Sequence, residues 1–243
     1  ESRRYTSMIS TDTLVIRRPG VVDYETAWHD MQAFTNNRNQ DTPDELWFLQ
    51  HPPVFTLGRN AKQVHLHDTG DIPVIHVSHL PEEVGRFADH LVLMNSGRVI
   101  ASGAVNELFT RLDLPLSHER GASSIIDARM AGHEPQDHLS RVEFPGGEFL
   151  VPLHDRPTGT PVRLSIAARD VSLTLERQSG TSILNIFETV VEEITPEGEA
   201  RALVRLRAGE TPLLAGITAR SARELGLAPG KTVYAQVKSV ALL

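Results

Sequence analysis

The sequence predicts an α/β N-terminal part with a truncated, mixed sheet, followed by an all-β C-terminal barrel. Two patterns predict this division. In the first hundred residues, short apolar runs alternate with stretches whose apolar residues recur every three or four positions, the spacing of one-sided helices. Beyond about residue 123, apolar and polar residues alternate, and Gly, Pro and Asp interrupt them at short intervals, which is typical of small antiparallel barrels.

The first elements form an incomplete α/β unit. Residues 13–17, 45–49 and 54–57 have the composition of strands, and Asp23 is a suitable cap for a helix between the first two. The inner face of this helix is predicted to carry Tyr24, Ala27, Trp28, Met31 and Phe34.

A second set of elements follows. The run PVIHV (73–77) predicts a buried strand, and Pro81 followed by two glutamates predicts a helix start. Residues 91–94 and 98–101 form a predicted hairpin, and a short helix comes next. The inner faces of the two helices are predicted to carry Val84, Phe87 and Ala88, and Val105, Leu108 and Phe109.

Two stretches of the predicted barrel echo each other. The segment from Gly159 to Ile166 matches the segment from Gly230 to Val237 in its glycine and its alternating apolar residues. Gly147-Glu148 likewise matches Gly209-Glu210. Such an echo predicts tandem halves of one barrel domain.

Composition excludes several classes of function. The formal net charge is -7 and basic runs are absent, which disfavours nucleic acid as a partner. The chain has no cysteine, so disulfides, thiolate metal sites and sulfur nucleophiles are excluded. It contains no apolar stretch of about 18 residues and no signal-peptide pattern, so a cytoplasmic location is expected. Met8 is a more natural start than Glu1, and residues 1–7 are expected to be upstream sequence.

The N-terminal runs LVIRRPGVVDYETAWHDMQAF (14–34) and DELWFLQHPPVFTLGR (44–59) resemble the beginning of bacterial octanoyltransferase, an enzyme of lipoate biosynthesis. The run from His51 to Gly58 is the most specific part of this resemblance. The family's Arg-Gly-Gly segment, its lysine and its cysteine nucleophile do not follow here. The resemblance therefore implies a fragment that cannot catalyse acyl transfer.

The run IPVIHVSHLPEEVGRFADHLVLMNSGRVIASG (72–103) resembles the segment after the Walker B strand in ABC-transporter ATPases. The resemblance continues through ARDVSL (168–173), TSILN (181–185) and VYAQVKSVALL (233–243) to the end of the chain. The last two runs are similar to the ATP-binding subunit of molybdate importers. In that family a C-terminal TOBE/Mop domain, an OB-like barrel, binds molybdate.

Together the two resemblances predict a chimera with three parts. Residues 1–71 would be the octanoyltransferase-like fragment, 72–118 the end of the ATPase domain, and 119–243 the TOBE/Mop-like barrel. The seam falls within residues 70–77. Recombination, a deletion fusion or the joining of reads from two genes would each produce such a junction.

The catalytic parts of an ABC ATPase are not expected in this chain. A phosphate-binding loop, a Walker B carboxylate and a signature loop would all precede residue 72. ATP and Mg²⁺ therefore belong to the parent family only, and His79 would be a remnant of its switch histidine. The run from Gly226 to Thr232 has three residues between its glycines where a phosphate loop needs four, and it leads into a strand, so it is interpreted as a turn.

Two other groups of residues are not interpreted as metal-binding or catalytic sites. Four histidines lie close together in the sequence, but no pattern of carboxylates accompanies them, so loop residues are favoured over a metal site. A Gly-x-Ser-x-Gly elbow is absent, so a Ser-His-Asp triad is not supported. The four histidines are His65, His67, His76 and His79.

The resemblance implies one oxyanion-binding site in the last barrel. Tetrahedral molybdate needs hydroxyl, amide and backbone donors together with a cation. The residues that match the family's Ser-x-Arg-Asn run and Lys-Ser pair are Ser182, Asn185, Lys238 and Ser239, and Leu184 stands where the pattern carries Arg. Alternation in 233–240 places Lys238 on the face away from the apolar row. The alternative is a solvent-facing lysine on an ordinary strand.

Three interpretations follow. The first is a module that binds molybdate or a related oxyanion, associated with the transmembrane subunits of an importer at the inner face of the cytoplasmic membrane. The resemblance also allows a homodimer through the C-terminal domain. The second is an enzyme, either an ATPase subunit or an octanoyltransferase, and the third is a chain whose N-terminal apolar faces lack partners.

Overall fold

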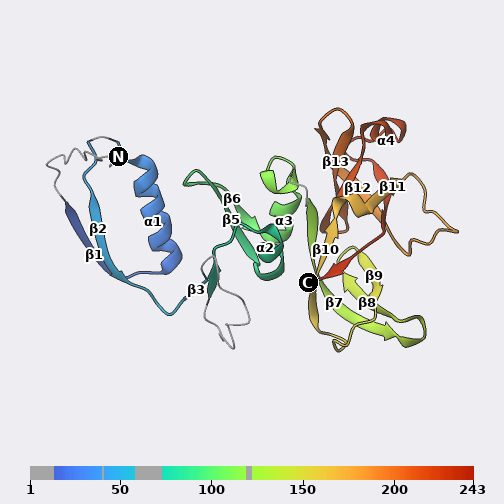
Figure 1. Ribbon diagram of the computed structural model, residues 1–243, viewed down its shortest axis with the longest axis horizontal. Coiled ribbons are helices and arrows are strands. Elements are labelled where there is room, and N and C mark those ends of the chain that lie inside the picture. Colours follow the sequence, from blue (N-terminus) through green and yellow to red (C-terminus); the bar gives the residue numbers. More distant parts are fainter. Residues whose placement is uncertain (1–13, 40, 58–72, 119–121) are drawn as a thin grey trace, which may run out of the picture. The chain divides into compact units, whose positions relative to one another are not determined.

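The computed structural model describes residues 14–39, 41–57, 73–118 and 122–243 (Figure 1). The chain divides into two compact units. The first comprises the residues up to His79 together with Met94–Ile100, and the second comprises Leu80–Leu93 together with Ala101–Leu243.

The first unit contains two pairs of parallel strands. Strands β1 and β2 pair in parallel and are connected through α1, whose cap Asp23 accepts a hydrogen bond from the backbone N–H of Thr26 at 3.1 Å, as predicted. Strands β3 and β4 form the other pair. Among the described residues these separate pairs replace the mixed sheet that the sequence predicts. The bounds are β1 Val15–Val21, α1 Tyr24–Asn37, β2 Glu45–Gln50, β3 Phe55–Leu57 and β4 Val74–His76.

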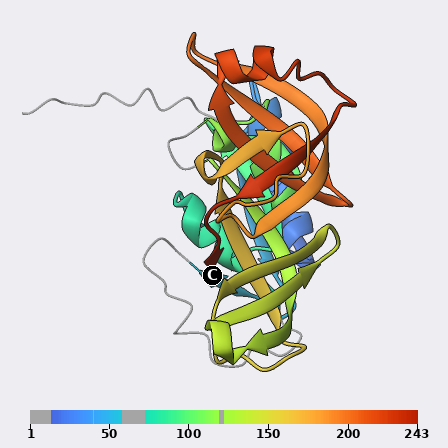
Figure 2. The ribbon, with the colours of Figure 1, turned by 90° about the vertical axis from the view of Figure 1, so that its right-hand side faces the viewer.

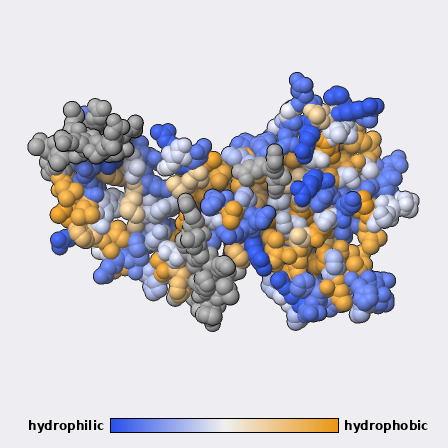
Figure 3. Space-filling view, in the orientation of Figure 1, coloured by the Kyte–Doolittle hydropathy of each residue, from blue (hydrophilic) through white to orange (hydrophobic). Residues whose placement is uncertain are grey.

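Much of the apolar surface of this unit is exposed (Figure 3). The prediction of a buried strand at 73–77 is wrong, because Val74 is 40% and Val77 66% exposed. Met31, predicted on the inner face of α1, is 42% exposed. Among the described strands, β4 pairs with β3 alone, in a two-stranded sheet that gives Val74 little cover.

Two short helices and a hairpin precede the barrel. Strands β5 and β6 turn at Ser96 and Gly97, whose φ angles of 50° and 76° are those of a tight two-residue hairpin turn. Helix α3 buries Val105, Leu108 and Phe109, as predicted. The bounds are α2 Pro81–Phe87, β5 His90–Asn95, β6 Arg98–Ala104, α3 Val105–Thr110 and the 3₁₀ turn η2 Pro115–Ser117.

The rest of the second unit consists of two five-stranded antiparallel sheets, in the orders β16-β10-β7-β8-β9 and β11-β15-β12-β13-β14. The alternation beyond residue 123 therefore predicts the class of this part correctly. The first sheet contains β7 Ser123–Glu134, β8 Leu139–Phe144, β9 Gly147–Pro152, β10 Pro161–Ala167 and β16 Ala241–Leu242. The second contains β11 Val171–Thr174, β12 Asn185–Glu197, β13 Arg201–Ala208, β14 Thr211–Thr218 and β15 Thr232–Val237. The remaining turns are η3 Pro135–Asp137, η4 Ala168–Asp170 and helix α4 Ala219–Glu224.

The two sheets exchange their last strands. Strand β11 follows β10 in the chain but pairs with β15 of the second sheet, while β16 follows β15 but pairs with β10 of the first. Figure 2 shows the dark red C-terminal segment leaving the upper sheet for the lower one. The two halves that the sequence echo predicts thus have the same strand order. Of their matching Gly-Glu pairs, Gly147-Glu148 begins β9, and Gly209-Glu210 lies in the turn between the equivalent strands β13 and β14.

One apolar core fills the space between the sheets. Val142, Phe149 and Leu164 of the first sheet and Val204 and Val233 of the second are all 0% exposed and belong to the same cluster. Three phenylalanines with ring centroids 4.6–5.2 Å apart join the sheets at one end of this core. They are Phe144, Phe149 and Phe187.

Two polar side chains link the sheets reciprocally. The hydroxyl of Ser124 on β7 accepts a hydrogen bond from the backbone N–H of Leu214 on β14 at 2.8 Å. The amide of Asn185 on β12 accepts from the N–H of Leu150 on β9 at 2.8 Å and donates to its carbonyl at 3.0 Å. Ser124 pairs with Ile166 of β10, and Asn185 pairs with Val237 of β15. Each link therefore runs from the first strand of one half to the third strand of the other.

An ion-pair cluster attaches α3 to the second sheet. Arg207 contacts Glu107 at 2.9 Å and Glu192 at 2.6 Å, and Arg205 contacts the same two carboxylates. Burial alone would raise the pKa of Glu107, but the hydrogen bond from Arg207 and the charges of both arginines outweigh it and hold this pKa below its ordinary value.

Replacing Ser124 with Ala should destabilise the barrel by about 1–3 kcal/mol, because the buried N–H of Leu214 then loses its acceptor. The measurement is the free energy of unfolding in urea. The matched control is Ser123→Ala on the same strand, for which we expect a change within about 0.5 kcal/mol. Equal effects of the two substitutions would contradict the assigned role of the hydroxyl.

Replacing Glu107 with Gln should lower the stability at pH 7 by about 1 kcal/mol or less, the range of partly exposed ion pairs. A depressed pKa means that the carboxylate contributes fully above its ordinary pKa of 4.5, and that this contribution is lost as the pH falls through the lower folded value. The difference between the wild type and the variant should therefore shrink below pH 4.5. Urea midpoints at several pH values, with Glu199→Gln as control, measure it, and a difference that does not depend on pH would contradict the assignment.

Candidate functional site

The residues predicted to bind an oxyanion lie on two neighbouring segments of the second sheet. Asn185, the first residue of β12, pairs with Val237, the last residue of β15. Because the two strands are antiparallel, the segment that enters β12 from Ser182 lies beside the segment that leaves β15 through Lys238 and Ser239. The register thus brings the two parts of the predicted motif to the same end of the sheet.

Three of the four side chains are exposed, namely Ser182, Lys238 and Ser239. The backbone N–H of Lys238 donates to the carbonyl of Asp170 at 2.8 Å, which anchors the position of this segment. The alternating apolar row of β15 is buried, as predicted, and Lys238 lies outside it. Gln236 lies on the face opposite this row and is nevertheless only 7% exposed. The apolar row consists of Val233, Ala235 and Val237.

Asn185 is only 9% exposed, and both polar atoms of its amide bind the backbone of Leu150. One of the two N–H groups of this amide is used by the carbonyl of Leu150. In the described state Asn185 therefore fixes where β12 begins and leaves the contact with solvent to its neighbours.

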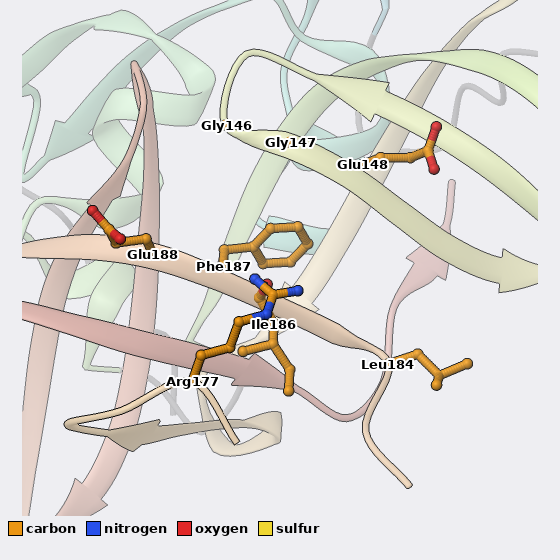
Figure 4. Close-up of a pocket in the computed structure, with 8 residues that line it drawn as sticks. All are labelled: Gly146, Gly147, Glu148, Arg177, Leu184, Ile186, Phe187 and Glu188. Carbon is orange, nitrogen blue, oxygen red and sulfur yellow. The ribbon is translucent and has the colours of Figure 1, made fainter. Parts of the chain in front are cut away.

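A pocket of about 290 Å³ opens beside this segment (Figure 4). It is bordered by the turn between β8 and β9, the start of β12 and the loop that precedes it. Arg177 comes from that loop, and its Nη1 donates to the carbonyl of Ile186 at 3.2 Å. Arg177 was not predicted as a site residue, because it precedes the TSILN run and belongs to no periodic segment. The lining residues are Gly146, Gly147, Glu148, Arg177, Leu184, Ile186, Phe187 and Glu188.

The histidines do not assemble into a site that the structure describes. His79 lies exposed in a bend before α2, and His76 ends β4, whereas His65 and His67 lie outside the described residues. Within the described ranges, no three His, Asp or Glu side chains are arranged to hold a metal ion.

The Gly226–Thr232 run is structural. The ammonium group of Lys231 donates to the carbonyls of Leu225 and Gly226, at 2.5 and 3.1 Å, directly after α4. The run then leads into β15, as expected for a turn before a strand and not for a phosphate loop. None of the helices in the described parts of the chain is long and apolar enough to span a membrane.

The C-terminal end of the chain matches a known domain family. The family model described as "TOBE domain" matches residues 181–243. The C-terminal region of the chain thus matches the TOBE domain family. Both segments of the predicted oxyanion site, from Ser182 to Asn185 and from Lys238 to Ser239, lie within the matched TOBE residues.

Curated relatives extend the match beyond the TOBE domain. The chain is 48% identical over 202 residues to the "Molybdenum import ATP-binding protein ModC" of Methylococcus capsulatus, which covers 80% of this chain and 57% of that protein. It is 48% identical over 201 residues to the protein of the same name from Aromatoleum aromaticum, which covers 80% of this chain and 53% of that protein. The chain thus spans about half the length of the curated relatives it matches.

A solved structure is also similar. This structure is that of the cytoplasmic molybdate-binding protein ModG with molybdate bound. The match covers 49% of this chain and 94% of the ModG chain, with 24% sequence identity and a TM-score of 0.43.

Proposed function

We propose that this chain is part of the ATP-binding subunit of a molybdate importer and that its C-terminal barrel binds molybdate or a related oxyanion. The observation that carries the proposal is the 48% identity to molybdenum import ATP-binding proteins over 80% of the chain. The TOBE match over residues 181–243 adds support, because it covers both segments of the predicted motif.

The chemistry of the exposed segments is suitable for a tetrahedral dianion. The hydroxyls of Ser182 and Ser239 are neutral donors, and Lys238 supplies a positive charge without offering a basic acceptor. Asn185 contributes by holding the first segment in position through Leu150. Leu184 supplies no donor where the family pattern carries Arg, so a cation from elsewhere is needed for strong binding.

The proposed organisation has three parts. Residues 119–243 form the oxyanion-binding barrel, and residues 72–118 are the end of an ATPase domain in which His79 is the remnant of a switch histidine. The protein acts in the cytoplasm at the inner face of the membrane, with the importer's transmembrane subunits as partners and a homodimer through the barrel as the assembly. ATP and Mg²⁺ would bind residues that this polypeptide does not contain.

For the N-terminal residues ahead of the importer match we propose a separate origin, as the beginning of an octanoyltransferase joined to the importer subunit. The resemblance of the N-terminal runs supports this origin. Such a fragment is catalytically inactive, because the chain has no cysteine to carry the acyl group.

Replacing Lys238 with Gln should weaken the binding of molybdate about tenfold or more, because a charge-assisted hydrogen bond is lost. Isothermal titration of the full chain with sodium molybdate measures the dissociation constant. The control is Arg223→Gln on α4, which removes the same charge at an exposed position outside both segments. Absence of molybdate binding by the wild type would reject the proposed function, and equal affinity of wild type and Lys238→Gln would reject the role of the lysine.

The purified polypeptide should neither bind nor hydrolyse ATP, because no Gly-x-x-x-x-Gly-Lys-Ser/Thr loop is present to cradle the phosphates. Phosphate release and binding of a fluorescent ATP analogue measure the two activities. A turnover that copurifies with the chain through several columns would contradict this expectation.

A further inference from the structure

We propose that Arg177 supplies a cation for the oxyanion, in the pocket that its side chain shares with Leu184. This inference rests on the proposed function and adds a residue, and a place for the anion, that lie outside the predicted motif. The ligand class is a tetrahedral dianion, because a planar guanidinium can donate two parallel hydrogen bonds to two of its oxygens.

The guanidinium of Arg177 is positioned but not neutralised. One of its N–H groups donates to the carbonyl of Ile186, which holds the side chain over the start of β12. In the part of the chain that the structure describes, Arg177 forms no ion pair with a carboxylate. A guanidinium has five N–H donors, so a single bond to a carbonyl leaves donors for an anion.

The shape of the pocket depends on the glycine turn between β8 and β9. A Cβ at Gly146 would lie 2.4 Å from the carbonyl oxygen of Ala208, and a Cβ at Gly147 would lie 3.1 Å from the ring of Phe187. Gly147 also has a φ of 144°. These two positions therefore exclude larger residues, and both glycines line the pocket.

The start of β12 also lines the pocket, through Ile186 and Phe187, which are 8% and 7% exposed. Leu184 is 60% exposed and lines the same pocket, so position 184 can also direct a side chain into this space.

Two carboxylates line the pocket and oppose the binding of an anion. Glu188 accepts a hydrogen bond from the hydroxyl of Tyr234 at 3.2 Å, and Glu148 lies 4.0 Å from the guanidinium of Arg141. In Figure 4 they lie on opposite sides of Arg177, at the margins of the pocket. They should lower the affinity without blocking the contact between the anion and the guanidinium.

The test is isothermal titration of the full chain with sodium molybdate and, separately, with sodium sulfate. Arg177→Gln should raise the molybdate dissociation constant about tenfold or more, and Glu148→Gln should lower it several-fold by removing an opposing charge. Arg223→Gln, a matched loss of one arginine on α4, should leave it within about twofold. The double variant Arg177→Gln, Leu184→Arg should recover most of the lost affinity, because the new guanidinium enters the same pocket.

The outcomes separate this inference from the proposed function. Binding by the wild type that is unchanged in Arg177→Gln overturns the role of Arg177 and leaves the proposed function intact. Absence of molybdate binding by the wild type overturns both. A loss of affinity in Arg177→Gln that Leu184→Arg does not restore, together with a lowered melting temperature, identifies a loop-folding role and also overturns the inference. Sulfate affinities that follow the same order as molybdate support a general site for tetrahedral dianions.

Discussion

The exchange of strands between the two sheets of the barrel determines most of what the second unit can do. Strand β11 completes the sheet built by the second half, and β16 completes the sheet built by the first, so neither sheet has its full hydrogen bonding without the other half. The common core and the reciprocal hydrogen bonds from Ser124 and Asn185 also hold the two halves together. The two halves therefore form one cooperative structure, although their sequences look like a repeat.

The candidate site lies where the chain crosses between the sheets. Lys238 and Ser239 belong to the segment that carries the chain from β15 to β16, and η4 is the equivalent crossing from β10 to β11. The two crossings meet where the N–H of Lys238 binds the carbonyl of Asp170. On the second crossing the side chains of Lys238 and Ser239 are open to solvent, while the backbone is held by the strands at both ends. Such a segment suits ligand binding.

The sequence predicted the local features well. Alternation located the strands of the barrel and the buried apolar row of β15, Asp23 was recognised as a cap, and the echo of glycine and apolar residues indicated two halves. The exchange of strands could not be predicted from the sequence, because periodicity indicates which face of a strand is buried but not which distant strand it pairs with. Val74 and Met31 were misjudged because apolar composition was taken for burial, which also requires a covering layer. No sequence pattern indicated a role for Arg177, since a single arginine in a loop is common and only folding brings it to the start of β12.

The exchange also bears on how the barrel could have arisen and how it would withstand damage. The connection between β11 and β12 is the one place where the chain passes from the first half to the second, and residues 175–184 within it are mostly exposed. A break there would produce two polypeptides, each holding a strand that the other lacks. Because each would supply the missing edge of the other, the pieces would remain associated without a covalent connection. An ancestor made of two identical short chains, joined later by duplication and fusion of its gene, would have had the same architecture.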